Sequence, residues 1–398
     1  MDRPTELAPL ADQERHTTLD VLRGVALFGV LWVNLQTSFR VSLFEHLFTF
    51  HTHGGWVNEW IDLVTAWLIE FKAFTVFSFL FGVGACIQAE RTASRGISAS
   101  RFMLRRFAVL LGIGLGHMFL VWNGDILCLY AICGILLIPL IRLPSAALVA
   151  LGLAAISLTF LPISSALIPS AEAMRTQAAA STPVYAHGTY HQIFVVNWTE
   201  TWYFIVPLLI SAMPKTFGLM LLGIASWRSG ILKQPARHRR LLAGIFGCFT
   251  AVGALATSMI FWSASTGRAL PVPPALVDAF SYVPLALGLT AGLVLWLNWS
   301  SAGPIAHLFA AAGQMALTNY LMQSLVFSLV FYGFGLGLFG RLSPASAGLI
   351  GIGVFALQLV ASRTWLRHYR FGPMEWLWRS FTYRQAQPMR RTVPSRRL

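Results

Sequence analysis

The sequence predicts an all-α, polytopic transmembrane helical bundle of about ten spans, and three observations support that prediction. Of its 398 residues, 56% are hydrophobic and only 11% are charged, whereas soluble domains carry roughly 25% charged residues. Apolar runs reach about 20 residues, the length that a helix needs to cross a bilayer. Alternation with a period of two residues is weak, which favours helices over a membrane β-barrel.

The apolar runs predict where the spans lie. The first run begins at Leu19 and continues past Phe39 without a cleavage site, so it is predicted to be a retained span. The predicted spans are 20–40, 73–89, 107–123, 126–142, 145–166, 215–231, 241–263, 279–298, 307–336 and 346–366. The segment 167–200 is the one long polar stretch, and we expect a loop there on the outer side.

The charge distribution predicts the orientation. The net charge is +14, which by itself could suggest nucleic-acid binding. The basic residues, however, lie in short loops at 91–106 and 228–240 and in the tail, as the positive-inside rule describes. We therefore expect both termini in the cytoplasm of a bacterium, a multi-pass inner-membrane protein and no nucleic-acid partner. The predicted organisation is a cytoplasmic segment 1–18, one transmembrane domain 19–384 and a basic cytoplasmic tail 385–398.

The first span carries polar residues at membrane depth, which are costly there and indicate functional sites. Asp20 and Arg23 are three residues apart and can pair on one helical face. Asn34 lies about three turns further on roughly the same side. This stripe either anchors the helix end through a structural ion pair or lines a substrate path. Lys72, at the start of the second span, either extends to the lipid headgroups or contacts a ligand.

The sequence GHMFLVWNGDIL at the end of the third span places His117 eight residues before Asp125, across a glycine. A carboxylate that orients an imidazole is the arrangement of a general base. The alternative is a histidine bonded to a backbone carbonyl, with Asp125 as the N-cap of the next helix.

Other polar residues allow two interpretations each. Asn319 and Gln323 share a face of the ninth span, where they form interhelical hydrogen bonds or contact a polar ligand. The pair His51 and His53 lacks a Glu or Cys that would complete a ligand set, so no metal site is predicted. The tail sequence RFGPMEWLWRSFTY predicts an interfacial helix that anchors the chain or holds an anionic donor. All four cysteines lie in apolar runs and are expected to be buried thiols.

Several long motifs occur in the order seen in one bacterial family. They are LDVLRGVALFGVLWVN, FSFLFGVG, HMFLVWNGDILCLYA, FGLMLLGIASWRSGIL, GQMALTNYLMQS and FGPMEWLWRSFTY. Across residues 17–384 the chain resembles YeiB-like bacterial membrane proteins. It is also distantly similar to the transmembrane acyltransferase superfamily, which includes heparan-α-glucosaminide N-acetyltransferases and shares the opening Leu-Asp-x-(Leu/Phe)-Arg-Gly segment. That similarity implies transfer of an acyl group from cytoplasmic acyl-CoA, with His53 at the position of the proposed catalytic histidine and Asn34 at that of a span asparagine.

These observations together predict an integral membrane acyltransferase. The expected donor is cytoplasmic acyl-CoA, acetyl-CoA first among them, and no bound cofactor is expected. The expected acceptor is a hydroxyl or amine on a small molecule, glycan or lipid-linked compound at the outer side. His117 ranks first as the base, with Asp125 orienting it, and His53 ranks second; Asp20, Arg23, Asn34, Lys72, Asn319 and Gln323 are the candidate binding residues. The alternative is a transporter of a small metabolite or amphiphile; further expected partners are membrane lipid and, as an option, a second copy of the chain.

Overall fold

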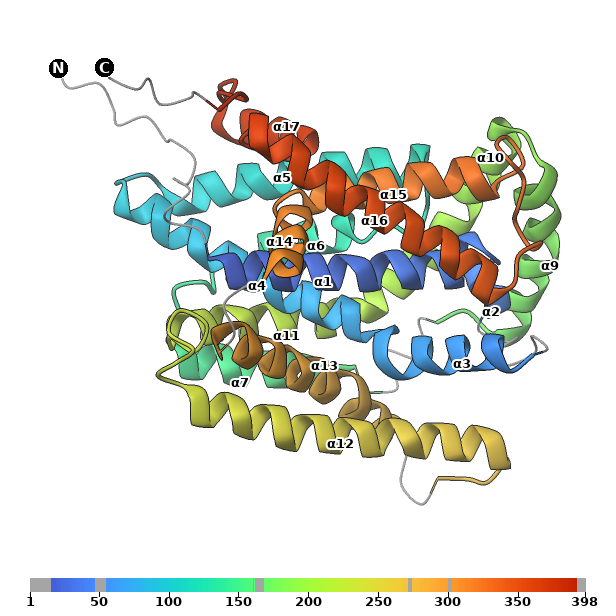
Figure 1. The fold of residues 1–398 in the computed structure, drawn as a ribbon, viewed down its shortest axis with the longest axis horizontal. Helices are drawn as coiled ribbons and strands as arrows, with labels where there is room; N and C mark the ends of the chain where they lie inside the picture. The colour runs from blue at the N-terminus through green and yellow to red at the C-terminus, as the bar shows by residue number, and fades with distance from the viewer. Residues whose placement is uncertain are drawn as a thin grey trace.

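The computed structural model describes residues 16–46, 55–159, 161, 168–270, 274–299 and 303–391, and these residues form helices and connecting loops without a strand (Figure 1). The helices in the first half are α1 (Thr17–Asn34), α2 (Leu43–His46), α3 (Trp56–Val64), α4 (Lys72–Ser94), α5 (Ala99–Leu120), α6 (Leu127–Leu137), α7 (Ser145–Leu158), α9 (Ala171–His187) and α10 (Tyr190–Glu200). Those in the second half are α11 (Val206–Arg228), α12 (Arg239–Thr266), α13 (Pro274–Trp299), α14 (Pro304–Gln314), α15 (Ala316–Phe331), α16 (Pro344–His368) and α17 (Pro373–Tyr383). The all-α prediction is confirmed.

Seven helical stretches in the described part of the chain are long and apolar enough to cross a membrane. Three shorter apolar helices, α6, α7 and α15, coincide with the predicted fourth, fifth and ninth spans. Every predicted span therefore overlaps an apolar helix, and the chain is a multi-pass membrane protein. Three of the long stretches include a π-helical turn: η2 (Leu35–Phe39), η3 (Thr65–Ile69) and η4 (Thr201–Ile205).

The basic loops predicted from the sequence lie together in space. Figure 1 shows the start of α1, the α4–α5 loop, the α11–α12 loop and the end of α16 at one end of the bundle. These are the segments in which Arg and Lys are concentrated, so the basic side of the bundle predicted from sequence exists as one end of the fold. We call it the basic end.

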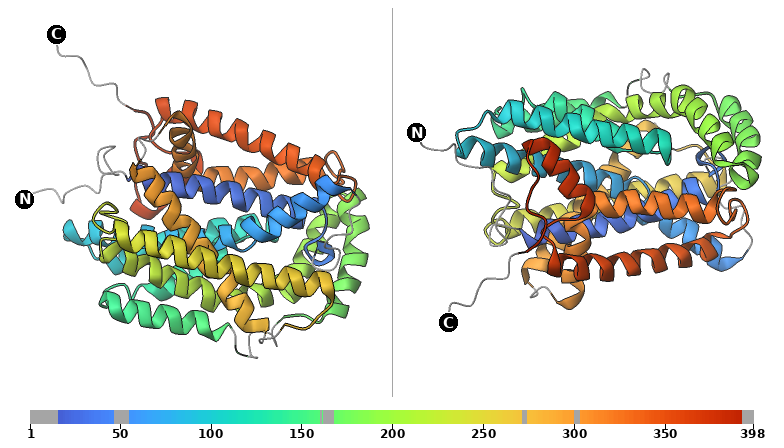
Figure 2. Two further views of the ribbon diagram at one scale, coloured as in Figure 1. Left: turned by 60° about the horizontal axis from the view of Figure 1, so that its bottom comes forward. Right: turned by 90° about the horizontal axis from the view of Figure 1, so that it is seen from above.

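Helix α1 lies at the centre of the bundle, between α16 on one side and α12 on the other (Figures 1 and 2). Small residues let neighbouring backbones approach it closely. A Cβ atom added to Gly24 would lie 2.1 Å from the carbonyl oxygen of Phe309, and one added to Gly313 would lie 1.9 Å from that of Asp20. The crossing of α1 and α14 therefore depends on two glycines that face the opposing backbone.

The ninth span is not one continuous helix, contrary to the prediction for 307–336. The chain breaks at Met315, with φ −109° and ψ 30°, so that α14 crosses α1 steeply while α15 runs along the bundle (Figure 1). The break exposes the first backbone N–H groups of α15, and such groups need a partner. Helix α17, which comes later in the chain, supplies it, as described below.

The segment predicted as a polar loop at 167–200 is also helical over most of its length. Helices α9 and α10 stand at the end of the bundle opposite the basic end (Figure 1). The N-cap hydroxyls of Ser170 and Thr189 explain where the two helices begin, because each accepts a hydrogen bond from a backbone N–H of the first turn. A smaller correction concerns Cys248, which is exposed, whereas Cys86, Cys128 and Cys133 are buried as predicted.

Candidate functional site

His117 and Asp125 meet where α5 turns back into α6. His117 Nδ1 lies 2.7 Å from Asp125 Oδ2, and the two residues are 4% and 0% exposed. The second carboxylate oxygen, Oδ1, accepts a hydrogen bond of 3.0 Å from the backbone N–H of Cys128 in the first turn of α6. Asp125 therefore fills both roles that the sequence suggested for it, because it orients the imidazole and caps the following helix.

The other ring nitrogen of His117 takes no part in this hydrogen bond. Nε2 is buried and forms no hydrogen bond with any of the described residues. The rings of Tyr320 and Trp122 lie beside the imidazole, with centroids 5.4 and 6.3 Å away. When Nδ1 carries the proton and donates it in the hydrogen bond to Asp125, Nε2 has a free lone pair. This is the state of a general base that can take a proton.

The turn that holds this pair is braced from the end of the bundle opposite the basic end. Asn123 donates a hydrogen bond of 3.0 Å to Glu200 Oε2, and Tyr185 donates one of 2.6 Å to the same oxygen. Gln177 donates to Glu200 Oε1 at 3.1 Å. Glu200 is buried and lies in α10, so this network ties α9 and α10 to the α5–α6 turn.

A cavity of about 270 Å³ opens beside the pair, between α1, α4, α5, α6, the α14–α15 break and α17. Its lining changes in character along its length. Near the basic end the polar and charged lining residues are His16, Asp20, Arg23, Gln88, Arg106, Gln314, Glu375 and Arg379. Toward the middle of the bundle the lining includes Phe77, Phe81, Leu110, Ile126, Leu127, Tyr130 and Tyr320. The cavity thus suits a ligand with an anionic head and an apolar arm.

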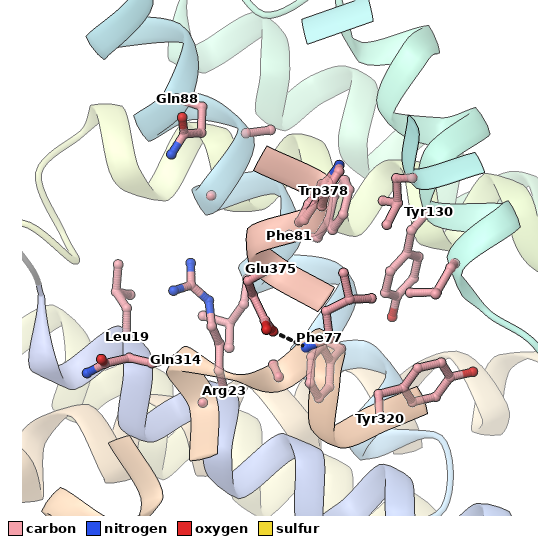
Figure 3. A pocket seen from close by; sticks show the side chains of 18 of the residues that line it. Leu19, Arg23, Phe77, Phe81, Gln88, Tyr130, Gln314, Tyr320, Glu375 and Trp378 are labelled. Carbon is pink, nitrogen blue, oxygen red and sulfur yellow. Dashed lines mark hydrogen bonds between the residues drawn. The ribbon is translucent and has the colours of Figure 1, made fainter. Parts of the chain in front are cut away.

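Figure 3 shows this arrangement: Leu19, Arg23 and Gln314 lie on one side, and Tyr130 and Tyr320 lie on the other. Tyr320 connects the cavity to the buried pair, because it lines the cavity and its ring contacts His117. The Tyr320 hydroxyl accepts a hydrogen bond of 3.3 Å from the backbone N–H of Ile126. The imidazole of His117 is therefore one side chain away from the cavity.

Helix α17 closes one wall of the cavity through Glu375. Its Oε1 accepts hydrogen bonds from the backbone N–H groups of Leu317 and Thr318 at 2.7 and 3.1 Å, and its Oε2 accepts one from the Thr318 hydroxyl at 2.5 Å. These are the N–H groups that the break at Met315 leaves open. Glu375 thus caps α15 from another helix and holds α17 in place.

Of the candidate binding residues, Asp20 and Arg23 form the expected pair, with Arg23 Nη1 3.0 Å from Asp20 Oδ1. Both also line the cavity. The pair is therefore an ion pair within α1 and at the same time part of the cavity wall. Asn34 is half-buried at the end of α1 and does not line the cavity. His53, with His51, lies outside the described residues.

Lys72, Asn319 and Gln323 face other helices and are not among the residues that line the cavity. Lys72 is only 3% exposed and donates a hydrogen bond of 2.7 Å to the carbonyl of Ala66. The expectation that it extends to the headgroups is therefore wrong, because it caps the end of the preceding π-helical turn. Asn319 Nδ2 donates to Ser362 Oγ at 2.9 Å, and Gln323 Nε2 donates to Gln358 Oε1 at 2.8 Å. These are the interhelical bonds to α16 that the sequence offered as one alternative.

Sequence reasoning did not identify Tyr320, Arg106 and Glu375 as site residues. Glu375 left a signal, because it is the only acidic residue after Asp278 and stands in a basic tail. Tyr320 left none, since an aromatic residue in a span is usually ordinary packing. Arg106 was one of several arginines in a loop, and only its neighbours in space distinguish it.

The capping role of Glu375 predicts how its substitution acts. Glu375→Ala leaves two backbone N–H groups without a partner and should cost about 1–3 kcal/mol of stability. Glu375→Gln keeps an acceptor oxygen and should cost less. Thermal unfolding of the purified protein in detergent measures both, with the exposed Glu172→Gln as the control that should not change. Equal losses for the Ala and Gln variants would contradict the capping role.

The same residue predicts a pH dependence. Burial raises the pKa of Glu375 above its ordinary value of 4.5, while hydrogen bonds from Thr318 and Leu317 oppose the shift. Because the folded-state pKa is the higher one, the contribution of Glu375 is complete below pH 4.5 and declines as the pH rises through the raised pKa. The stability of Glu375→Gln should therefore fall less over that range than the stability of the unsubstituted protein.

Comparisons with known proteins agree on one family. Residues 226–385 match a family model described as a protein of unknown function, DUF418. The uncharacterized protein YxaH of Bacillus subtilis is 32% identical over 97% of this chain and 98% of its own length. The uncharacterized protein YeiB of Escherichia coli is 28% identical over 94% of this chain and 98% of its own length. The similarity therefore extends over nearly the whole length of each protein.

Proposed function

The chain belongs to the YeiB-like, DUF418 family of membrane proteins, and we propose that it acts as an acyltransferase. In this proposal an acyl group moves from acyl-CoA, which enters from the cytoplasmic side, to a hydroxyl or amine acceptor on the outer side of the bacterial inner membrane. The observation that carries the proposal is the buried His117–Asp125 pair beside the apolar part of the cavity, where Nε2 forms no hydrogen bond with the described residues.

The proposed reaction is direct transfer without a covalent enzyme intermediate. The acceptor oxygen attacks the thioester carbonyl carbon while Nε2 of His117 takes the acceptor proton. The carbon–sulfur bond then breaks, and the leaving thiolate receives that proton from the imidazolium. The products are an acyl ester and free CoA thiol, or an amide when the acceptor is an amine. Asp125 keeps the imidazole in the required tautomer and stabilises its charged form.

Tyr320 is the side chain best placed to stabilise the oxyanion that forms on the carbonyl oxygen. Its hydroxyl accepts from Ile126, and its own proton has no acceptor among the residues that the structure describes. It also lines the cavity that would hold the thioester. Asn34 and Asn319, which the sequence predicted as binding residues, are not part of that lining. A preorganised donor of this kind contributes most in a water-excluded site.

The test is acyl transfer by the purified protein in nanodiscs. Radiolabelled acetyl-CoA is the donor, and a crude envelope extract supplies acceptors. We expect label in a new product and release of free CoA in equal amount. Movement of a substrate across reconstituted vesicles without any covalent change would instead indicate the transporter, and the acyltransferase proposal would then be wrong.

A further inference from the structure

Two arginines at the basic end of the cavity are held in place by aromatic rings. The guanidinium of Arg106, in α5, lies 3.7 Å from the ring centroid of Trp378 in α17. Trp378 Nε1 in turn donates a hydrogen bond of 2.8 Å to the carbonyl oxygen of Arg106. Arg379 follows Trp378 in α17, and its guanidinium lies 4.5 Å from the ring centroid of Phe371. Stacking fixes the plane of a guanidinium, and its N–H groups lie in that plane, where they can donate to an anion.

Three arginines gather at this point of the cavity, and Arg106 lies among them. Arg379 and Arg23 both lie close enough to Arg106 to repel it, and all three arginines line the cavity. Asp20 is bonded to Arg23, and the carboxylate of Glu375 is bonded to the first turn of α15. Arg106 forms no ion pair with any carboxylate in the described part of the chain. Like charges gathered in a partly desolvated cavity are stabilised when an anion lies between them.

The rest of the cavity restricts what that anion can be. Beyond the arginines the lining turns apolar, with Phe81, Phe107 and Leu110 leading toward Tyr130. A free inorganic ion would leave this part empty, whereas an amphiphile with an anionic head fills both parts. A guanidinium group can donate to two oxygens at once, and a phosphate has enough oxygens to accept from two arginines, whereas a carboxylate has only two oxygens, which favours a phosphate head.

We propose that Arg106 and Arg379 form a phosphate-binding site for a ligand whose apolar arm extends into the cavity toward Tyr130 and Tyr320. The proposal rests on the proposed function and deepens it, since an acyl-CoA with a long acyl chain carries both parts. An anionic phospholipid from the surrounding leaflet has the same chemistry, and the two sources are separated by experiment.

The experiment measures binding and does not depend on turnover. Purified full-length protein in phosphatidylcholine nanodiscs is titrated with octanoyl-CoA, with octanoyl-pantetheine, which has the same thioester but no phosphate, and with a short-chain lysophosphatidic acid. Arg106→Gln and Arg379→Gln are the test variants, and Arg106→Lys keeps the charge but removes the planar fork. Arg101→Gln is the matched control, because Arg101 lies in the same helix, is exposed and does not line the cavity. Thermal unfolding confirms that each variant is folded.

We expect Arg106→Gln and Arg379→Gln each to weaken binding of a phosphate-bearing ligand by about tenfold or more, as loss of a charge-assisted hydrogen bond does. Arg101→Gln should bind as the unsubstituted protein does, and octanoyl-pantetheine should bind weakly to every variant. Arginine-dependent binding of octanoyl-CoA supports the site and a CoA donor. Arginine-dependent binding of lysophosphatidic acid alone supports the site but removes the CoA donor from the proposed function. Binding of both phosphate ligands that is unaffected in folded Arg106→Gln and Arg379→Gln would overturn the site and leave the acyltransferase proposal standing.

Discussion

His117→Gln should lower the rate of acyl transfer by about 10²- to 10⁴-fold, the usual contribution of a positioned general base. Glutamine fits a buried site of similar size and can still bond to Asp125, but it offers no basic nitrogen at the position of Nε2. Because the proposed role of His117 is to take the acceptor proton and not to hold the donor, binding of the donor should be nearly unchanged. The measurement is label transfer from acetyl-CoA, with donor binding measured on the same preparation.

Two comparisons make this result specific. His191→Gln, at an exposed position of α10, is the control and should transfer at the rate of the unsubstituted protein. Asp125→Asn should also lower transfer strongly. An amide can hydrogen-bond to either tautomer of His117, so it no longer fixes the proton on Nδ1. Transfer that survives in folded His117→Gln would exclude this histidine as the base, and His53→Ala would then be the variant to measure.

Gly313→Ala should destabilise the protein by about 3 kcal/mol, at the upper end of the usual cost of overpacking. The added methyl group would lie 1.9 Å from the Asp20 carbonyl oxygen and 2.8 Å from the Gly24 backbone nitrogen. Both are backbone atoms, which cannot move aside by changing a rotamer, so α1 and α14 must separate. Since Asp20 and Gly313 both line the cavity, donor binding should weaken as well.

The measurement is thermal unfolding in detergent, beside Gly353→Ala as the control. Gly353 lies in α16, and nothing lies within 4 Å of the position of its added Cβ atom. In a helix alanine is favoured over glycine by up to about 1 kcal/mol, so this control should be neutral or slightly stabilising. A Gly313→Ala variant as stable as the control would show that the two helices do not cross as closely as described.

Much of the helical architecture follows from local sequence. An apolar run of about 20 residues is helical in a membrane, because a helix satisfies every backbone group within the segment itself. The pairs Asp20–Arg23 and His117–Asp125 were predictable for a related reason. Their members are three and eight residues apart, so one helical turn or one tight reversal brings them together whatever the rest of the fold does.

The tertiary structure decided the features that join distant segments. The break at Met315 divides an apolar run that the sequence predicts to be one span. Glu375 stabilises the break by accepting a hydrogen bond from the backbone N–H of Leu317, 58 residues earlier in the chain. The cavity depends on the same contact, since α17 forms one of its walls. Arg106 became distinct from its neighbours in sequence only because it stacks on the ring of Trp378 and lies close to Arg379.

The sequence by itself therefore determined the class of protein, the approximate positions of its helices and the His117–Asp125 pair, because hydrophobicity and short spacings act locally. Which helices touch, where a helix is interrupted and which polar residues reach a shared cavity depend on contacts between segments far apart in the chain. Lys72, Asn319 and Gln323 illustrate this point. Their polarity marked them as candidates for a ligand, and only the packing showed that neighbouring helices use that polarity instead.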